Sequence, residues 1–81
     1  MYDKNRRNDL DIQADILRVA MSRGGARKTQ IVYRANLNFY IVKKYLNRLM
    51  SRGLLVVKGT RYFSTDKART YIDTIEALYA L

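Results

Sequence analysis

The chain has 81 residues, of which 48% are hydrophobic, and a formal net charge of +9 from 16 Lys or Arg against 7 Asp or Glu. A chain of this length makes one small domain with a thin core, and such domains often gain stability by pairing. The sequence contains no Cys and no His, which excludes disulfides, thiolate chemistry and the commonest metal ligand.

The amino terminus is polar, and Lys4, Arg6 and Arg7 occur there without apolar periodicity. We expect residues 1–9 to form a mobile basic arm, which is either simply solvated or lies along DNA, and residues 10–81 to form a single domain. The longest aliphatic run spans residues 54–57, far below a membrane span. We therefore expect a soluble, cytoplasmic protein with no membrane partner.

Two helices are predicted in the first part of the domain. The first begins at Asn8 or Asp9, either of which can cap it, and runs to about Arg23, where two glycines follow. Its apolar stripe is wider than one neighbouring element needs, so part of it could face a second subunit. A short second helix is predicted from about Thr29 to about Ala35.

A third helix is predicted within residues 37–55, with Asn38 as its cap. Apolar residues at spacings of three and four define its inward face: Val42, Tyr45, Leu46, Leu49 and Met50. The outward residues are basic, amide-bearing or aromatic: Phe39, Tyr40, Lys43, Lys44, Asn47 and Arg48. A short helix, a tight turn at residues 36–37 and such a third helix are typical of a helix-turn-helix with its recognition element.

A β-hairpin is predicted next, from two short β-rich runs at residues 54–57 and 62–64. Gly59 followed by Thr60 suits a type II′ turn, so Lys58 and Arg61 would flank the tip and project from it. In winged helices such a tip rests on the DNA backbone or in the minor groove.

The last helix is predicted from a Thr65 cap to the carboxyl terminus. Its apolar stripe continues beyond what so small a domain can cover, which would expose large side chains to water. We therefore predict a homodimer, with dimerisation through the helix at about residues 65–81. The candidate dimer residues are Tyr71, Ile75, Leu78 and Tyr79.

The charge is concentrated in one tract. Residues 16–65 contain eleven Lys or Arg and no Asp or Glu. A solvated face usually mixes signs, and like charges at Lys44 and Arg48, four residues apart on a helix, repel slightly. An anionic partner accounts for both features, which favours nucleic acid, so we expect Lys43, Lys44 and Arg48 to contact DNA.

These residues resemble a known family, the archaeal winged-helix proteins typified by a small, basic, chromatin-associated protein. Residues 28–39, KTQIVYRANLNF, are similar to its signature, and Tyr45, Leu49 and the Gly-Leu-Leu at 53–55 continue the likeness. The resemblance covers roughly residues 10–72. Departures are Gln30, where the family usually has Arg, Asn38 in place of Ser, and Ala68, where Gly is common.

The resemblance implies a winged helix-turn-helix fold, mainly α with a small β-hairpin: a three-helix core, a wing and a carboxyl-terminal helix. It implies DNA contacts from the second helix, the recognition helix and the wing. These are Lys28, Thr29, Gln30 and Arg34; Asn38, Phe39, Tyr40, Lys43, Lys44 and Asn47; and Lys58 and Arg61. The chromatin-type member extends its last helix into a long coiled coil, whereas this sequence stops at Leu81. A compact transcriptional regulator of archaeal or archaeal-virus origin is therefore expected.

The function predicted from the sequence is sequence-specific binding of double-stranded DNA by a dimer, with recognition helices in successive major grooves. Alternatives are a non-specific chromatin or nucleoid protein, an RNA-binding module that stacks unpaired bases, and a protein-interaction module. No enzyme activity, cofactor, metal or small-molecule ligand is expected. Tyr is the only plausible nucleophile, and Tyr33, Tyr45 and Tyr71 are better interpreted as apolar-face residues.

Overall fold

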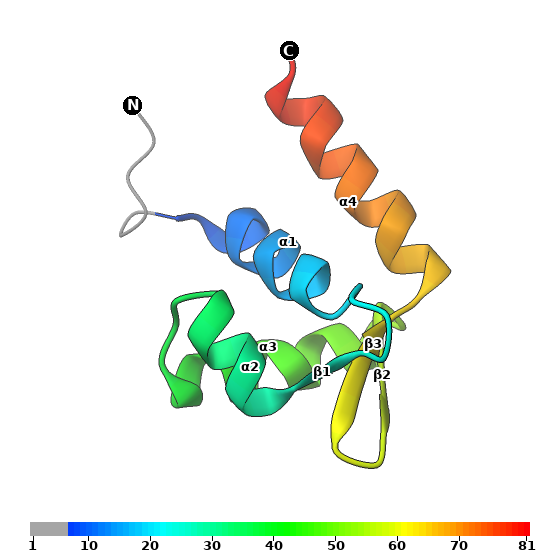
Figure 1. Ribbon diagram of the computed structural model, residues 1–81. Helices are drawn as coiled ribbons and strands as arrows, with labels where there is room; N and C mark the ends of the chain where they lie inside the picture. Colours follow the sequence, from blue (N-terminus) through cyan, green and yellow to red (C-terminus); the bar gives the residue numbers. More distant parts are fainter. Residues whose placement is uncertain (1–6) are drawn as a thin grey trace.

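The computed structural model of the protein describes residues 7–81 (Figure 1). Most of the predicted basic arm lies outside these residues. The elements in chain order are α1 (Asp9–Val19), β1 (Ala26–Arg27), α2 (Lys28–Arg34), α3 (Phe39–Ser51), β2 (Leu55–Lys58), β3 (Arg61–Ser64) and α4 (Asp66–Tyr79). The predicted fold class, a helical domain with a helix-turn-helix and a hairpin, is confirmed.

Helix α1 begins where the sequence predicts and ends earlier. The side chain of Asn8 accepts a hydrogen bond from the N–H of Asp11, and the Asp11 carboxylate accepts one from the N–H of Asn8. These two backbone N–H groups, which have no partner within the helix, are therefore satisfied. The helix ends at Val19, not at Arg23 as predicted. The reason is tertiary, because the carbonyl of Ala20 accepts from the N–H of Ser64 at the end of β3.

The turn between α2 and α3 is built without glycine. Asn36 adopts a φ of 54°, a left-handed conformation that Asn tolerates better than most residues. The N–H of Leu37 bonds to the carbonyl of Val32, and the N–H of Asn36 to that of Tyr33, which together satisfy the end of α2. Asn38 then caps α3 as predicted, with its side-chain oxygen 2.8 Å from the N–H of Ile41.

The sheet has three antiparallel strands in the order β1–β3–β2, one more than the predicted hairpin. Strands β2 and β3 are joined by a two-residue loop in which Gly59 alone has a positive φ, 63°, as a type II′ turn requires. The two-residue strand β1 pairs Ala26 with Tyr62 and Arg27 with Arg61. It is too short to give a periodic signal, so the sequence did not reveal it.

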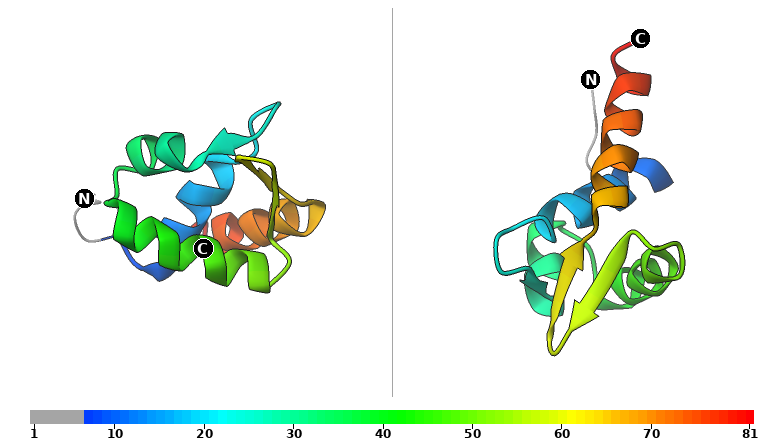
Figure 2. Two further views of the ribbon diagram at one scale, coloured as in Figure 1. Left: turned by 90° about the horizontal axis from the view of Figure 1, so that it is seen from below. Right: turned by 90° about the vertical axis from the view of Figure 1, so that its right-hand side faces the viewer.

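The core lies where α1 meets the other helices and the base of the hairpin (Figures 1 and 2). Helix α1 packs against α2 on one side and α4 on the other. The inward face predicted for α3 is correct: Val42, Leu46 and Leu49 are buried, and Tyr45 and Met50 are half-buried against them. The outer face of α3 is thereby directed away from the core.

Helix α4 runs past the core, and its last turn projects beyond the remaining elements (Figure 2). Ile75, a predicted dimer residue, is only 3% exposed within the single chain, because the helix packs on α1 at this level. Tyr71 is half-buried and donates its hydroxyl to Gln13. Leu78 and Tyr79 are 54% and 57% exposed, so the surface left for a partner is the last turn.

Candidate nucleic-acid interface

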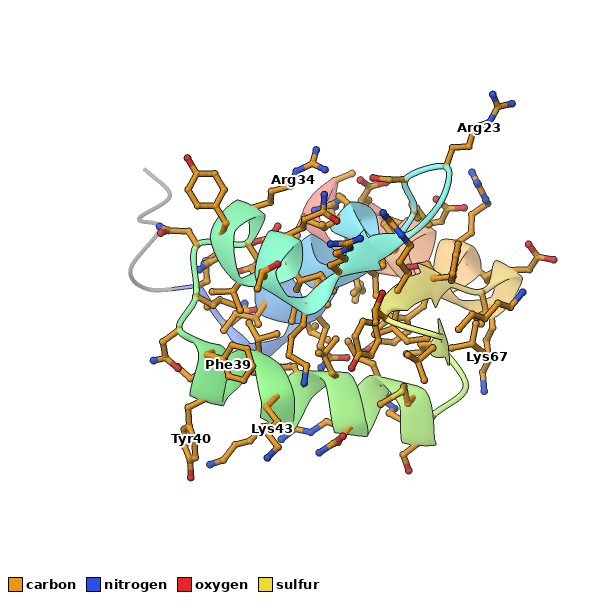
Figure 3. All side chains as sticks on the ribbon, turned by 60° about the horizontal axis from the view of Figure 1, so that its bottom comes forward. Arg23, Arg34, Phe39, Tyr40, Lys43 and Lys67 are labelled. Carbon is orange, nitrogen blue, oxygen red and sulfur yellow. The ribbon has the colours of Figure 1, made fainter. Side chains whose placement is uncertain are left out.

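The outer face of α3 carries the largest group of predicted contact residues. Tyr40 and Phe39 are 68% and 51% exposed, and Lys43, Lys44 and Asn47 are exposed along the following turns. Figure 3 shows Tyr40 and Lys43 projecting outward from α3. The Nζ of Lys44 lies 4.7 Å from the centre of the Tyr40 ring, which fixes a cation beside an aromatic face.

Phe39 connects α3 to the start of α2. The Nζ of Lys28, the first residue of α2, lies 5.2 Å from the centre of the Phe39 ring. The structure therefore brings Lys28, predicted to lie near the DNA backbone, beside the first turn of α3. The apolar ring and the cation form one amphipathic corner of this face.

Two predicted amide contacts are partly used inside the chain. The oxygen of Asn38 is engaged in capping α3. The side-chain oxygen of Gln30 accepts from the N–H of Arg27 at 2.8 Å and closes the start of α2. Among residues 7–81, the NH₂ donor of each amide has no acceptor and is available to an outside partner.

The wing reaches the start of α2. Lys58 and Arg61 are paired across the hairpin at its tip, as the predicted turn requires. Lys58 is exposed as predicted, whereas Arg61 is half-buried and its guanidinium lies 3.5 Å from the Gly24 carbonyl oxygen. A shallow hollow of about 410 Å³ is lined by Arg27, Lys28, Thr29 and Thr60, so the first residues of α2 lie next to the hairpin loop. Three hydrogen-bonding side chains from α2 or its cap and one from the wing therefore meet at one place.

Arg34 lies apart from the other predicted residues. It is exposed at the end of α2, and Figure 3 shows it pointing away from Lys43 and α3. It lines a different hollow, of about 500 Å³, formed by α1, the end of α2 and α4. Arg34 was predicted to contact DNA with the other residues of the second helix. Membership of that helix alone does not determine whether a side chain points toward α3 or away from it.

Arg48, the last residue of the predicted outward set, is engaged within the chain. Its guanidinium is 3.1 Å from Oδ1 of Asp9 and 5.1 Å from the centre of the Tyr45 ring. The Tyr45 hydroxyl donates to the same carboxylate oxygen, which holds the pKa of Asp9 below its ordinary value of 3.8. Burial raises the pKa of Tyr45 above 10.0, and the hydrogen bond to Asp9 raises it further.

The charges of the described residues are segregated. The ion pairs of Arg7, Arg18 and Arg48 are made with Asp9, Asp15 or Glu76, which belong to α1 or α4. Within residues 7–81, eight cations on β1, α2, α3, the hairpin and the α1–β1 loop have no carboxylate within 4.0 Å: Arg23, Arg27, Lys28, Arg34, Lys43, Lys44, Lys58 and Arg61. Three further cations after α3 or on α4 also have none: Arg52, Lys67 and Arg69. Apart from Arg34, which points away, the cations at the start of α2, on α3 and on the wing give that face of the molecule a positive potential.

Sequence reasoning missed some surface residues. Arg23 projects from the α1–β1 loop (Figure 3), and Arg27 lies beside the wing. Neither was predicted as a contact residue. Both lie in the tract of residues 16–65 without Asp or Glu, which could have indicated them. Tyr33 was interpreted as an apolar-face residue, which is wrong, because it is 85% exposed. Helix α2 has only seven residues, too few for periodicity to distinguish its faces.

Residues 7–81 contain no group of three or more His, Cys, Asp or Glu arranged to hold a metal ion. None of the helices described is long and apolar enough to cross a membrane.

Comparison with known proteins identifies related folds. A family model described as winged helix-turn-helix matches residues 6–81. The crystal structure of Sso10a-2, a DNA-binding protein from Sulfolobus solfataricus, is similar over 91% of this chain and 80% of that chain, with a TM-score of 0.79 and 29% sequence identity. None of the curated proteins matches significantly.

Proposed function

We propose that this chain, which belongs to the winged helix-turn-helix family, binds double-stranded DNA through the outer face of α3 and the wing. The observation that carries the proposal is the group of cations on α2, α3 and the hairpin that have no carboxylate partner within residues 7–81. The similarity to Sso10a-2, a DNA-binding protein, supports it. The proposed role is binding without catalysis.

In the proposed complex α3 enters the major groove, whose width admits one helix. Lys43 and Lys44 reach guanine or phosphate oxygens, and Asn47 pairs with adenine. The exposed ring of Tyr40 packs on a thymine methyl or a sugar. Lys58 at the wing tip contacts a flanking phosphate, together with its cross-strand partner Arg61.

We further propose that the chain acts as a dimer and a sequence-specific transcriptional regulator. The last turn of α4 exposes Leu78 and Tyr79, and Leu81 follows it with its surface fully open. A twofold dimer through this end presents two α3 helices to half-sites about 34 Å apart. Analytical ultracentrifugation tests the interface: Leu78→Glu yields monomers, whereas Tyr33→Ser, which changes another exposed apolar residue, leaves the dimer intact.

The DNA proposal is tested by fluorescence anisotropy on random and selected duplexes across a salt series. Neutralising five or six phosphates per dimer predicts a slope of about −5 for log affinity against log salt. Tighter binding to twofold-symmetric selected sites supports a specific regulator. Equal affinity for all duplexes indicates a nucleoid-type protein, and preference for single-stranded RNA at the same salt indicates an RNA-binding module. If neither random nor selected duplexes are bound in a salt-dependent way, the proposal is contradicted.

A further inference from the structure

Three side chains converge on the carboxylate of Asp9, the first residue of α1. The Tyr45 hydroxyl and the Arg48 guanidinium reach Oδ1 at 2.5 and 3.1 Å, and the amide of Gln13 reaches Oδ2 at 2.5 Å. Tyr45 and Arg48 belong to α3, so this carboxylate joins the amino-terminal end of α1 to the recognition helix. Neither DNA contact nor core packing explains the convergence.

We infer that Asp9 is a positioning and selectivity residue, which withholds Arg48 from DNA phosphates and so limits the contact face of α3 to the side that bears Lys43, Lys44 and Asn47. The inference rests on the proposed DNA function and deepens it. It assigns Arg48 to the internal structure of the domain, although the sequence suggested a DNA contact.

The position of Arg48 on α3 supports this assignment. At about 100° per residue, Lys43 and Arg48 lie about 140° apart around the helix axis. Arg48 therefore occupies the edge of the outer face next to Tyr45 and α1, and Lys43 occupies the opposite edge. Lys44, about 40° from Arg48, lies between them. A phosphate that approached Arg48 would also approach the Asp9 carboxylate, which is 55% exposed and repels it.

The contacts of Arg48 form a network and are more than a single surface ion pair. An isolated exposed pair contributes little to stability and would yield readily to a phosphate. Here the guanidinium also lies over the Tyr45 ring, and the hydroxyl of that ring is fixed to the same carboxylate. Arg48 can leave only by giving up the ring and the carboxylate together.

The network continues from Asp9 into α4. Gln13, which is only 2% exposed, donates to Asp9 and accepts from the Tyr71 hydroxyl at 2.8 Å. The guanidinium of Arg52, at the end of α3, lies 5.4 Å from the centre of the Tyr71 ring and 3.4 Å from the Gln13 oxygen. The α1-facing edge of α3 is thus tied to α1 and α4 at two successive turns.

The test compares Asp9→Asn with Asp73→Asn in the full chain, on random and selected duplexes across a salt series. Both variants lose one negative charge, but Asp73 lies on α4, is exposed, and makes no ion pair among residues 7–81. In Asp9→Asn, the release of Arg48 should steepen the slope of log affinity against log salt by about 0.9 per protomer. At 0.15 M salt this corresponds to about a fivefold gain in affinity for random duplex per protomer. Asp73→Asn should leave the slope unchanged. Asp9→Asn should also reduce the ratio of affinity for the selected site to affinity for random duplex.

Arg48→Gln provides the second arm, which does not depend on Asp9→Asn folding. If Arg48 is withheld, this variant keeps the wild-type slope, whereas Lys44→Gln flattens it by about 0.9 per protomer. In the double variant Asp9→Asn with Arg48→Gln the slope returns to the wild-type value.

Two results overturn the inference while leaving the DNA function intact. In the first, the wild-type protein binds duplex DNA, and the Asp9→Asn and Asp73→Asn variants bind it with equal salt slopes. The other is an Arg48→Gln variant that flattens the slope as much as Lys44→Gln does. A wild-type protein without salt-dependent duplex binding is a different failure, because it removes the proposed function itself.

Discussion

Cations are used differently on the two sides of α1. On the side of α4, Arg18 is 2.9 Å from Glu76 and 3.5 Å from Asp15, and Arg7 is 2.8 Å from Asp15. On the side of α3 and the wing, Lys43 and Lys58 have no carboxylate within 4.0 Å among residues 7–81. The first group holds helices together, whereas the second remains available to an outside anion.

Aromatic residues follow the same division. Tyr45 and Tyr71 are half-buried, and their hydroxyls donate to Asp9 and Gln13 inside the chain. Tyr40, only five residues from Tyr45 on the same helix, is 68% exposed beside Lys44. A tyrosine on α3 is therefore structural or available for contact according to the edge of the helix on which it lies.

The strongest way to break the comparison is to remove cations from one side at a time. Lys43→Ala with Lys44→Ala deletes four charges per dimer from the proposed contact face, and we expect a loss of roughly 1,000-fold in duplex affinity at 0.15 M salt. Lys67→Ala with Arg69→Ala removes the same charge from α4 and serves as the control. Anisotropy at one salt concentration compares them, and equal losses would show that net charge alone governs binding.

The attachment of the wing gives the next largest effect, on stability. Gly25 has a φ of 72°, and a Cβ there would lie 2.7 Å from the Tyr62 carbonyl oxygen and 2.8 Å from the Phe63 ring. Gly24 has a φ of 88° with nothing within 4 Å of its Cβ position.

We therefore expect Gly24→Ala to lower the free energy of unfolding by about 1–2 kcal/mol through backbone strain alone. Gly25→Ala should cost about 1–3 kcal/mol more, because the Cβ would also overpack the β1–β3 contact. Urea denaturation measures both variants. Equal losses would mean that the neighbouring strand moves aside freely and that the wing is not held there.

The sequence predicted the local features of the fold well, because short-range chemistry determines them. Asn38 and Thr65 cap their helices as expected, and the spacing of apolar residues in α3 separates its buried and exposed faces correctly. Gly59 likewise determines a turn type that depends only on its own backbone. In each case the cause lies within a few residues of the effect.

The features that the sequence did not predict depend on contacts between distant segments. Strand β1 exists because β3 offers it a partner, and α1 ends early because Ser64 bonds to Ala20. Arg48 reads as one of several outward cations, and only the fold shows that the first turn of α1 brings Asp9 to it. Periodicity identifies an exposed edge but not the neighbour that it meets.

Wing substitutions sharpen the comparison with a smaller effect. Lys58→Ala removes one cation per protomer from a site proposed to contact phosphate only. We expect it to weaken specific and random duplexes equally and to flatten the salt slope by about 0.9 per protomer. A matched Asn47→Ala, on the α3 face, should instead reduce the preference for the selected site. Loss of sequence preference in Lys58→Ala would place the wing tip in a groove, where it reads bases.

The smallest expected effect is a pH dependence on the structural side. The hydrogen bond from Tyr45 is the largest cause that keeps the pKa of Asp9 below 3.8, with further contributions from Gln13 and Arg48. A lowered pKa in the folded state stabilises the fold at pH values above 3.8, and this stabilisation is lost as the pH falls through the lower, folded-state pKa.

The free energy of unfolding of the wild type should therefore exceed that of Asp9→Asn by a constant amount above pH 3.8, and the two should converge below it. Asp9 is largely exposed, so solvent screening limits the difference to less than about 1 kcal/mol. Tyr45→Phe, which removes the largest cause, should move the convergence to higher pH. Urea titrations at a series of acidic pH values measure it, and curves that stay parallel throughout would show that the carboxylate does not hold α3 in the folded state.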